Sequence, residues 1–357
     1  MKIAVLHPQA KVMGWAVKML FLISTYLQDK NSVDFYTFSF DKANCFPELN
    51  KNLNIINLNL KWFSKFFWII SLSFSLRKYD IILAWNSPMH FVAVLAKIFN
   101  PRLKIFWYLQ NIPVYYLPQN KSILVYFKRF VERLIIGKID KIISNSNFIR
   151  NEVLKYFKAK SDVIYPVIDT EFFIRDRSPP GDRSQDQNLF INWRLVKWKN
   201  VELAIRSFFE LKDKYPNLKL YISWNWEEKS KLQKLSQNNK DIIFLWEINQ
   251  EEVRTYYQMC NISLFTSKID SFGLTIIEAM SCEKPVVSLT LGWATEIIED
   301  WKTGFLAKDE TEFIKKVDNL LQNPELRATI WQNARQFVVN NFSLKTLYNK
   351  LNEIFCI

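Results

Sequence analysis

Short apolar runs alternate with longer, helix-periodic segments along the first half of the chain. The short runs are rich in Ile, Val, Phe and Tyr and predict strands at Ile3–Leu6, Val33–Phe38, Ile55–Leu58, Ile81–Ala84, Ile105–Leu109, Lys141–Ser144 and Val163–Tyr165. The segments between them predict helices at Met13–Gln28, Trp62–Leu76, Met89–Phe99, Ser122–Ile136 and Asn147–Phe157. Such an alternation predicts a parallel, doubly wound α/β sheet.

The second half repeats this alternation. Its predicted strands are Leu189–Asn192, Leu218–Ser223, Ile242–Leu245, Ile262–Phe265, Val286–Leu289 and Phe305–Leu306, with helices between them. The chain closes on helical patterns at Thr311–Gln322, Pro324–Asn340 and Leu344–Phe355. Between the halves, Arg175–Gln187 is polar and contains two prolines and one glycine, which is typical of a linker. The pattern therefore predicts two Rossmann-like domains.

Length and composition agree with a two-domain protein. The chain has 357 residues, of which 49% are hydrophobic, so each half can bury a core. Four cysteines fall in no paired spacing, which favours a reduced, cytoplasmic protein, and two histidines argue against a histidine-based metal site. Met1–Leu6 has the pattern of a buried strand rather than of a signal peptide. Phe66–Leu76 is shorter than the roughly 20 residues that a membrane span needs, so we expect no integral membrane protein.

Charge is distributed unevenly along the chain. Residues up to Tyr165 include 23 Lys and Arg against 9 Asp and Glu, whereas the remainder has 25 against 26. The whole excess of +13 therefore belongs to the first half, which suggests an anionic partner such as a membrane surface, a lipid phosphate or a nucleic acid. No nucleic-acid-binding module is recognisable, so we do not expect that partner. The alternative is that the charge serves solubility alone.

One basic, aromatic segment stands out within this half. Lys61–Lys78 reads K-W-F-S-K-F-F-W-I-I-S-L-S-F-S-L-R-K, with bulky apolar residues in the middle and basic residues at both ends. This composition suits a helix that lies in a membrane interface, with its rings in the acyl boundary and its cations toward anionic headgroups. The alternative is a helix that faces the core of the first domain.

The most informative stretch lies between two predicted strands of the second half. Thr266–Pro285 reads T-S-K-I-D-S-F-G-L-T-I-I-E-A-M-S-C-E-K-P, a polar loop followed by an apolar helix that opens near Gly273. Loops at the carboxyl ends of parallel strands are where open α/β sheets bind ligands. The first amides of such a helix can hold an anion such as a diphosphate. Two carboxylates, Asp270 and Glu278, flank the turn.

This stretch resembles the signature of the retaining glycosyltransferases of family 4, which have the GT-B fold. That signature is a Glu, then Ser-Phe-Gly-Leu-Thr-Ile-Ile, a second Glu and Ala-Met, and the chain departs from it only in Asp270, which replaces the first Glu. The alternative is that Ser271 caps an ordinary amphipathic helix and Glu278 is a solvated surface residue. The apolar neighbours of Glu278 favour a carboxylate held near a site.

A second segment, W-R-L-V-K-W-K-N from Trp193 to Asn200, resembles the Gly-Arg-Leu-Val…Lys-Gly turn of the same family. Arg194 and Lys199 occupy the matching places, while Trp193 replaces the glycine. Both cations could reach one diphosphate, Arg through two donors and Lys as a point charge. The alternative is two basic residues in an ordinary surface loop.

Other positions depart further from the family. The loop after the first strand usually carries two adjacent glycines, and here only Gly14 is present. A strand end that often carries a histidine near the donor sugar has Gln110 and Asn111, whose amides can hydrogen-bond a hydroxyl but cannot exchange a proton. Trp293 replaces the second glycine of the loop after the signature, and Ser146 is interpreted as a helix cap.

The resemblance implies a GT-B fold of two Rossmann-like domains that face a cleft, and retaining transfer of a sugar from a nucleoside diphosphate sugar to a hydroxyl. Arg194, Lys199, Asp270 and Glu278 would be the catalytic set: the cations neutralise the leaving diphosphate, Glu278 binds the ribose and Asp270 the donor sugar. No metal or other cofactor is expected, because the two cations and the helix amides serve the diphosphate. The remaining donor-binding residues would be Ser271, Phe272, Gly273, Leu274, Thr275 and Gly14, with Gln110 and Asn111 on the acceptor or sugar side.

We expect an acceptor-side domain at 1–168, a linker at 169–187, a nucleotide-sugar-binding domain at 188–340 and a C-terminal helix at 341–357 that returns to the first domain. The expected partners are a nucleotide sugar, a glycan or lipid-linked acceptor of surface polysaccharide or glycolipid assembly, and an anionic membrane surface on the cytoplasmic side. The alternative function is a non-catalytic nucleotide-sugar-binding or assembly protein of the same fold. The sequence leaves the donor base, the sugar and the acceptor open.

Overall fold

The computed structural model describes residues 1–10, 15–42, 45–46, 51–58, 65–113, 122–174, 187–193, 196–223, 228–245, 248–268 and 272–356. It divides into two compact units. Unit 1 comprises Met1–Pro166 and Tyr348–Ile357, and unit 2 comprises Val167–Leu347.

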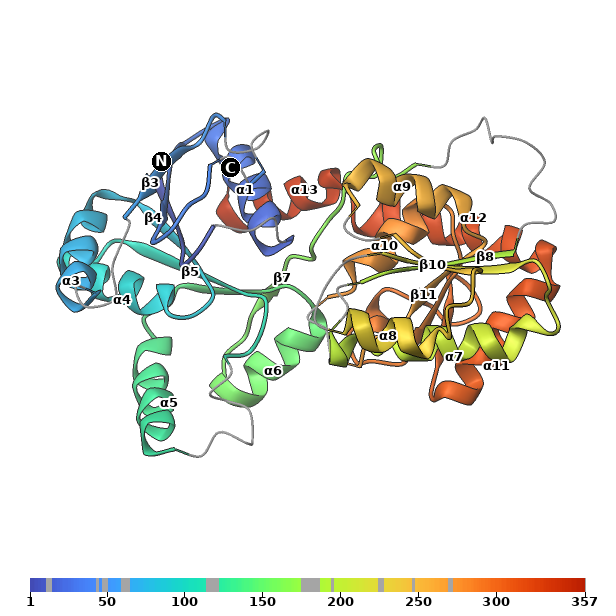
Figure 1. Ribbon diagram of the computed structural model, residues 1–357. Coiled ribbons are helices and arrows are strands. Elements are labelled where there is room, and N and C mark those ends of the chain that lie inside the picture. The colour runs from blue at the N-terminus through green and yellow to red at the C-terminus, as the bar shows by residue number, and fades with distance from the viewer. Residues whose placement is uncertain are drawn as a thin grey trace. The chain divides into compact units, whose positions relative to one another are not determined.

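Unit 1 is built on a parallel sheet whose strands run in the order β3-β2-β1-β4-β5-β6-β7. These strands are β1 (Lys2–His7), β2 (Ser32–Thr37), β3 (Asn54–Asn57), β4 (Ile81–Trp85), β5 (Lys104–Leu109), β6 (Lys141–Ser144) and β7 (Asp162–Val163). Its helices are α1 (Trp15–Gln28), α3 (Lys65–Ser75), α4 (Met89–Phe99), α5 (Ile123–Ile136), α6 (Asn147–Phe157) and α13 (Leu344–Phe355). In Figure 1, α1 and α13 lie on one side of the strands and α3 and α4 on the other.

Unit 2 repeats the plan with the order β10-β9-β8-β11-β12-β13. Its strands are β8 (Gln187–Asn192), β9 (Leu218–Ser223), β10 (Ile242–Phe244), β11 (Ile262–Phe265), β12 (Val286–Leu289) and β13 (Phe305–Ala307). Its α-helices are α7 (Val201–Lys212), α8 (Lys229–Leu235), α9 (Gln250–Met259), α10 (Leu274–Ser281), α11 (Glu310–Gln322) and α12 (Pro324–Asn341). Figure 1 shows α9, α10 and α12 on one face of the sheet and α7, α8 and α11 on the other.

The predicted α/β fold class is confirmed, because the strands are parallel and helices cover both faces of each sheet. Strands buried on both faces need nearly continuous apolar runs, and β4 and β11 are buried along their whole length. Polar residues fix the helix ends. Ser146 is the N-cap of α6 as predicted, since its side chain accepts the Ile149 amide, and Asn249 and Glu252 form a capping box on α9.

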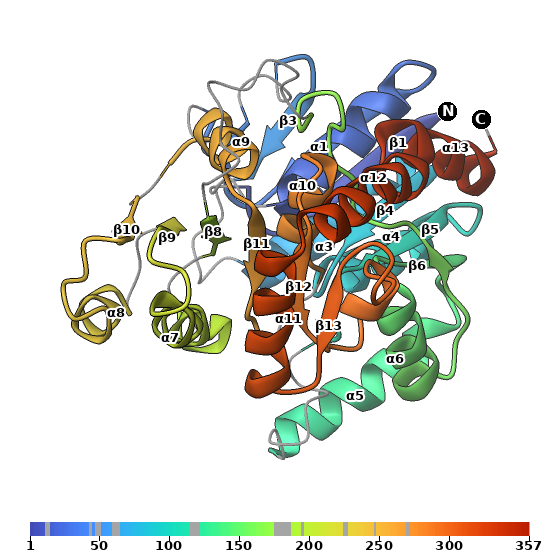
Figure 2. The ribbon, with the colours of Figure 1, turned by 90° about the vertical axis from the view of Figure 1, so that its right-hand side faces the viewer.

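The final helix belongs to unit 1 from Tyr348 onward. Tyr348 of α13 stacks on Tyr26 of α1 with ring centroids 4.1 Å apart, and Phe355 packs against Phe106 of β5 at 5.0 Å. The Lys141 ammonium also donates to the Ile354 carbonyl at 2.8 Å. Figure 2 shows α13 beside α1 and β1.

The segment predicted to begin the linker is packed instead. Phe173 is buried, and the Arg335 guanidinium of α12 donates to the carbonyls of Thr170 at 2.7 Å and Phe173 at 2.9 Å. Residues 169–174 are therefore part of unit 2. The guanidinium supplies the donor that these two carbonyls need. The rest of the predicted linker, 175–186, lies outside the described residues. No helix in the described part of the chain is long and apolar enough to span a bilayer.

Candidate active site

The two central strands of the unit 2 sheet define where its ligand site is expected. β8 is the first strand of this unit, and it pairs with β9 on one side and β11 on the other, so the strand order reverses at β8. Ligands of doubly wound sheets bind outside the carboxyl ends of the strands at such a reversal. The loops that leave β8 and β11 carry the two segments singled out in the sequence.

The loop after β8 holds Lys199 in a buried position. A short 3-10 helix spans Lys197–Lys199, and the Lys199 side chain is only 3% exposed. Its ammonium lies 3.5 Å from the ring centroid of Trp193, within cation–π range. Arg194, predicted to act beside Lys199, lies outside the described residues.

The loop after β11 is tied to the β8 loop by two hydrogen bonds. The Thr266 hydroxyl donates to the Lys199 carbonyl at 2.8 Å, and the Lys268 amide donates to the Trp198 carbonyl at 2.9 Å. Thr266 is fully buried, so this link is shielded from water. The two segments are therefore held together by one side-chain and one backbone hydrogen bond. Asp270 and Ser271 lie outside the described residues.

Gly273 precedes α10 and is required there by close packing. A Cβ atom at this position would lie 2.4 Å from a ring carbon of Trp293 and 2.9 Å from the Ile276 side chain. Trp293, which replaces a family glycine, is 2% exposed and packs edge-on against Phe265 at the end of β11. The glycine of the signature thus makes room for a tryptophan from the next loop.

The first turn of α10 contains the other predicted donor-binding residues. Phe272 and Leu274 are buried. The Leu274 amide, expected to be available to an anion, donates to the Phe272 carbonyl at 3.0 Å. The Thr275 hydroxyl is buried and has no hydrogen-bond partner in the structure. The Thr275 hydroxyl is thus a buried donor that its described surroundings leave unsatisfied.

Glu278 is not a solvated surface residue. It is 3% exposed, and the buried Tyr257 of α9 places its hydroxyl 3.3 Å from the carboxylate and 3.1 Å from the Thr275 carbonyl. Burial and then the charge of Glu278 raise the pKa of Tyr257 well above its usual value, so its hydroxyl keeps its proton. Asn192, at the end of β8, donates to the Tyr257 hydroxyl at 3.5 Å. Glu278 is thus linked through the Tyr257 hydroxyl to Asn192 of β8, the strand at which the strand order reverses.

Unit 1 has a corresponding reversal between β1 and β4. Gln110 and Asn111 follow β5, which lies next to β4. Gln110 is 8% exposed, and its backbone amide donates to the Asn86 side chain after β4 at 3.1 Å. Asn111 is exposed. His7, at the end of β1, is buried, and burial lowers its pKa to about 4. Its Nδ1 accepts the Gln9 amide at 3.2 Å. Gly14 lies outside the described residues.

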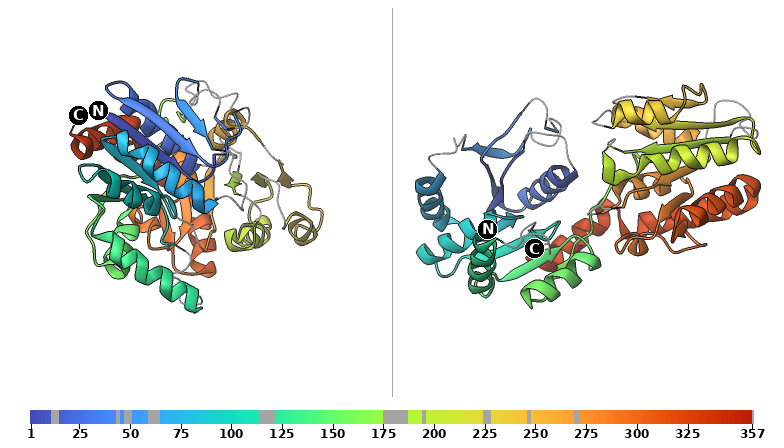
Figure 3. Two further views of the ribbon diagram at one scale, coloured as in Figure 1. Left: turned by 90° about the vertical axis from the view of Figure 1, so that its left-hand side faces the viewer. Right: turned by 60° about the horizontal axis from the view of Figure 1, so that its bottom comes forward.

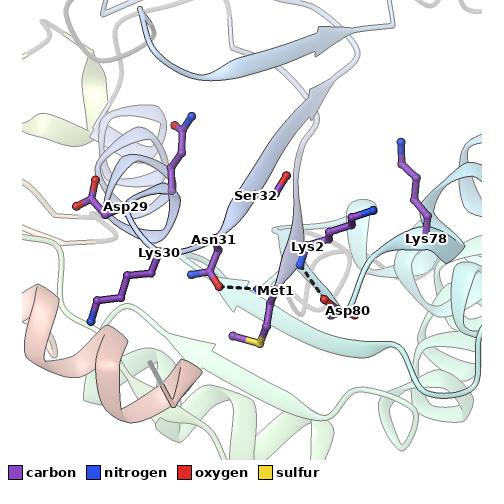
Figure 4. A pocket seen from close by; sticks show the side chains of 9 residues that line it. Met1, Lys2, Asp29, Lys30, Asn31, Ser32, Lys78 and Asp80 are labelled. Atoms are coloured by element: carbon purple, nitrogen blue, oxygen red, sulfur yellow. Dashed lines mark hydrogen bonds between the residues drawn. The ribbon is translucent and has the colours of Figure 1, made fainter.

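A broad hollow of ≈ 710 Å³ in unit 1 lies at the other ends of the strands. Met1, Lys2 and Ser32 at the start of β1 and β2 line it, together with Lys78 and Asp80. Figure 4 shows the Lys2 amide bonded to Asp80 and the N-terminal amine to Asn31. Because this is the amino edge of a parallel sheet, it is not where the fold binds its ligands.

The described residues contain no group of three or more His, Cys, Asp or Glu side chains suited to hold a metal ion. The structure places Lys199 in the segment after β8 and Glu278 in α10, which follows the loop after β11, and it leaves Gln110 and Asn111 in the other unit. Sequence reasoning did not find Tyr257, Asn192 and Thr266. Their signal is weak, since each is a polar residue in or beside an apolar run, which indicates burial but not a partner.

Two family models together match nearly the whole chain. Residues 174–337 match "Glycosyl transferases group 1" and residues 16–172 match "Glycosyltransferase Family 4". The second model ends close to the division between the two units.

Similar proteins agree with these matches. An uncharacterised glycosyltransferase of Methanocaldococcus jannaschii is 28% identical over 66% of this chain, a match that spans 63% of the relative. Alpha-1,3/1,6-mannosyltransferase ALG2 of Dictyostelium discoideum is 24% identical over 99% of this chain and 97% of that protein.

Solved structures share the fold at lower identity. Anabaena Alr3699/HepE in complex with UDP and glucose has a TM-score of 0.79 at 21% identity and covers 100% of this chain and 99% of its own. A glycosyltransferase from Rickettsia africae has a TM-score of 0.83 at 19% identity, with 99% and 97% covered.

Proposed function

Because this chain belongs to the group 1 glycosyltransferases of the GT-B fold, we propose that it transfers a hexose from a nucleoside diphosphate sugar to a hydroxyl with retention of anomeric configuration. The observation that carries the proposal is the pair Lys199 and Glu278. The buried cation lies in the segment after β8, the buried carboxylate lies in α10, and Thr266 in the loop before α10 bonds to the Lys199 carbonyl. The full-length similarity to a mannosyltransferase supports a hexose donor.

In this proposal the chain's groups act on the two ends of the donor. The bond between the anomeric carbon and the diphosphate breaks, the acceptor oxygen bonds to that carbon, and its proton passes to the departing diphosphate. Lys199 and Arg194 stabilise the charge that develops on the leaving group, together with donors in the first turn of α10. Glu278 accepts hydrogen bonds from the ribose, and Asp270 from the donor sugar.

We propose further that the reaction needs no metal ion, since cations of the chain serve the diphosphate. Activity that persists at full rate in excess EDTA would support this, whereas loss of activity that Mg²⁺ or Mn²⁺ restores would contradict it.

The partner proposed for unit 1 is an anionic membrane surface that presents a lipid-linked glycan acceptor, on the cytoplasmic side, in surface polysaccharide or glycolipid assembly. Support comes from α5. Its large apolar side chains recur on one helical face and are mostly exposed: Ile123 (89%), Tyr126 (54%), Phe127 (62%), Phe130 (58%) and Leu134 (62%). Lys128, Arg129 and Arg133 lie on the same helix. Apolar side chains beside cations suit the interface of an anionic bilayer.

The segment Lys61–Lys78 was expected either to lie in a membrane interface or to face the core of unit 1, and the structure shows features of both. Residues 61–64 lie outside the described residues. In α3 and the turn after it, Leu72 and Leu76 are buried, while Trp68 and Phe74 are nearly half exposed. The helix therefore packs on the core and also presents aromatic rings, and α5 is the more exposed of the two candidates. In Figures 1 and 3, α5 lies at the periphery of unit 1.

The first experiment is a thermal-shift screen of the wild type against UDP, GDP, ADP and TDP, followed by transfer assays with sugars of the base that binds. Glu278→Ala and Lys199→Ala should each abolish transfer while the protein stays folded. Wild-type activity in both variants would refute the site. Nucleotide affinity without any turnover of donor would favour the alternative, a non-catalytic binding or assembly protein.

A further inference from the structure

The two tryptophans that stand where the family has glycines pack against the same phenylalanine in unit 2. The Trp193 ring packs edge-on against Phe265 with centroids 4.7 Å apart, and Trp293 packs against the same Phe265 at 5.2 Å. Phe265 is 1% exposed at the end of β11. The three rings form an aromatic row from the β8 loop to the loop after β12.

The row ends at both segments proposed to bind the diphosphate. Trp293 covers Gly273, the residue before α10. At the other end, the Trp193 ring faces the Lys199 ammonium at 3.5 Å. The row thus connects a buried cation to the start of α10 through packed side chains, without crossing to another unit.

A buried lysine is costly to hold in one position. Its side chain has four rotatable bonds, and a desolvated ammonium is unfavourable unless other groups stabilise it. The face of an indole attracts a cation, more strongly when both are shielded from water. Because Phe265 fixes the indole, the indole in turn restricts where the ammonium can lie.

We propose that Trp193 is a positioning residue for Lys199, and that its indole holds the ammonium where it meets the diphosphate of the donor. The inference rests on the proposed function. It adds that this chain fixes its phosphate-binding lysine with an aromatic face at a position where the family has glycine. Trp193 touches neither the sugar nor the reacting atoms in this role, and it acts through Lys199.

The test compares a diphosphate with its nucleoside. Trp193→Leu should raise the Kd of the bound nucleoside diphosphate about tenfold and leave the Kd of the matching nucleoside unchanged, because only the diphosphate meets Lys199. Trp193→Phe should retain most of the affinity, since a phenyl ring also attracts a cation. Isothermal titration of the full chain with UDP, GDP, ADP or TDP and the matching nucleoside measures both.

A double mutant separates positioning from packing. In a Lys199→Ala background, Trp193→Leu should have no additional effect on the Kd of the diphosphate. The matched control is Trp198→Leu, a tryptophan of the same loop that is 48% exposed and should bind as the wild type does.

Three results would overturn the inference while the proposed function stands: an unchanged diphosphate Kd in Trp193→Leu, an equal loss for the nucleoside, or a full additional loss in the Lys199→Ala background. Failure of the wild type to bind any of the four diphosphates would overturn the proposed function, and this inference with it.

Discussion

At the scale of single residues, the hydroxyl of Tyr257 is a buried donor that reaches the Glu278 carboxylate. It is buried, lies 3.3 Å from the carboxylate and is itself reached by Asn192. A carboxylate that binds a ribose needs a fixed orientation, and this contact supplies one. The tyrosine is therefore expected to act on ligand binding through Glu278 rather than on the fold alone.

Tyr257→Phe should raise the Kd of the nucleoside diphosphate about fivefold, since one hydrogen bond to a charged group is lost without opening a cavity. The same substitution should not change the binding of a 2′,3′-dideoxy analogue, which lacks the ribose hydroxyls. Tyr256→Phe, at the neighbouring position on α9, is the control. Equal losses for both ligands would show that the role of Tyr257 is structural.

His7 gives unit 1 a dependence on pH. Its folded pKa is about 4 because the imidazole is buried, against 6.5 in an unfolded chain. The unfolded state therefore binds the proton first, so the contribution of His7 to stability is complete above pH 6.5 and is lost as pH falls toward 4. His7→Asn keeps an acceptor for the Gln9 amide. It should reduce the fall in the free energy of unfolding between pH 6.5 and 4 by up to about 3 kcal/mol. Denaturant unfolding at several pH values measures this free energy. The same pH dependence in the wild type and in His7→Asn would contradict the role given to His7.

At the scale of elements, the start of α10 depends on the loop after β12. Gly273→Ala should destabilise the protein by about 1–3 kcal/mol, because the new Cβ meets the Trp293 ring. Adding Trp293→Ala should restore space, so the two substitutions together should cost less than their sum. Strict additivity in urea unfolding would show that the ring is not the obstacle.

The exposed face of α5 predicts a second result at this scale. Phe127→Glu with Phe130→Glu should greatly reduce sedimentation of the full chain with phosphatidylglycerol vesicles, because two charges replace apolar side chains that would enter the interface. Leu154→Glu on α6, 55% exposed, is the matched control. Binding of the wild type should weaken as salt rises and should be small with phosphatidylcholine alone.

If the double variant sediments as the wild type does, α5 is not the docking element. If instead the wild type forms dimers that the variant cannot form, the face is an interface between two copies and the membrane proposal for α5 is wrong.

The elements themselves were predictable to a large degree. Each strand expected from an apolar run is present with ends within two residues of those predicted, because parallel strands buried on both faces impose a strong local pattern. The stripe on α5 was not identified, although Ser122–Ile136 was expected to be helical. Its apolar residues fit the periodicity of a core-facing helix equally well, and only the packing of the unit shows that this face is exposed.

The site was predictable in part and for a different reason. Lys199 and Glu278 were proposed through their resemblance to a family signature, whereas Tyr257 lies outside that signature and Trp193 departs from it. The contacts of these two residues depend on which strands become neighbours in the sheet. Since β8 and β11 are separated by 69 residues between Asn192 and Ile262, a local pattern does not reveal that they pair.

At the scale of the whole molecule, the positive net charge of the chain lies almost entirely in unit 1. Residues 1–166 contain the entire positive excess, and Tyr348–Ile357 adds one lysine and one glutamate. The unit with the exposed apolar helix is thus also the cationic one, and the unit with Lys199 and Glu278 is close to neutral. This separation favours surface attraction by one unit and selective binding of a small anion by the other.

The placement of α13 has a consequence for how the protein is made. Unit 2 is a continuous stretch, Val167–Leu347, whereas unit 1 also includes Tyr348–Ile357, the later part of α13 and the residues after it. During synthesis the ribosome therefore delivers every residue of unit 2 before it delivers Tyr348 and Phe355, the α13 residues that pack on Tyr26 and Phe106. The domain that begins first is completed last, and a nascent chain that ends before Tyr348 holds a whole unit 2 beside an unfinished unit 1.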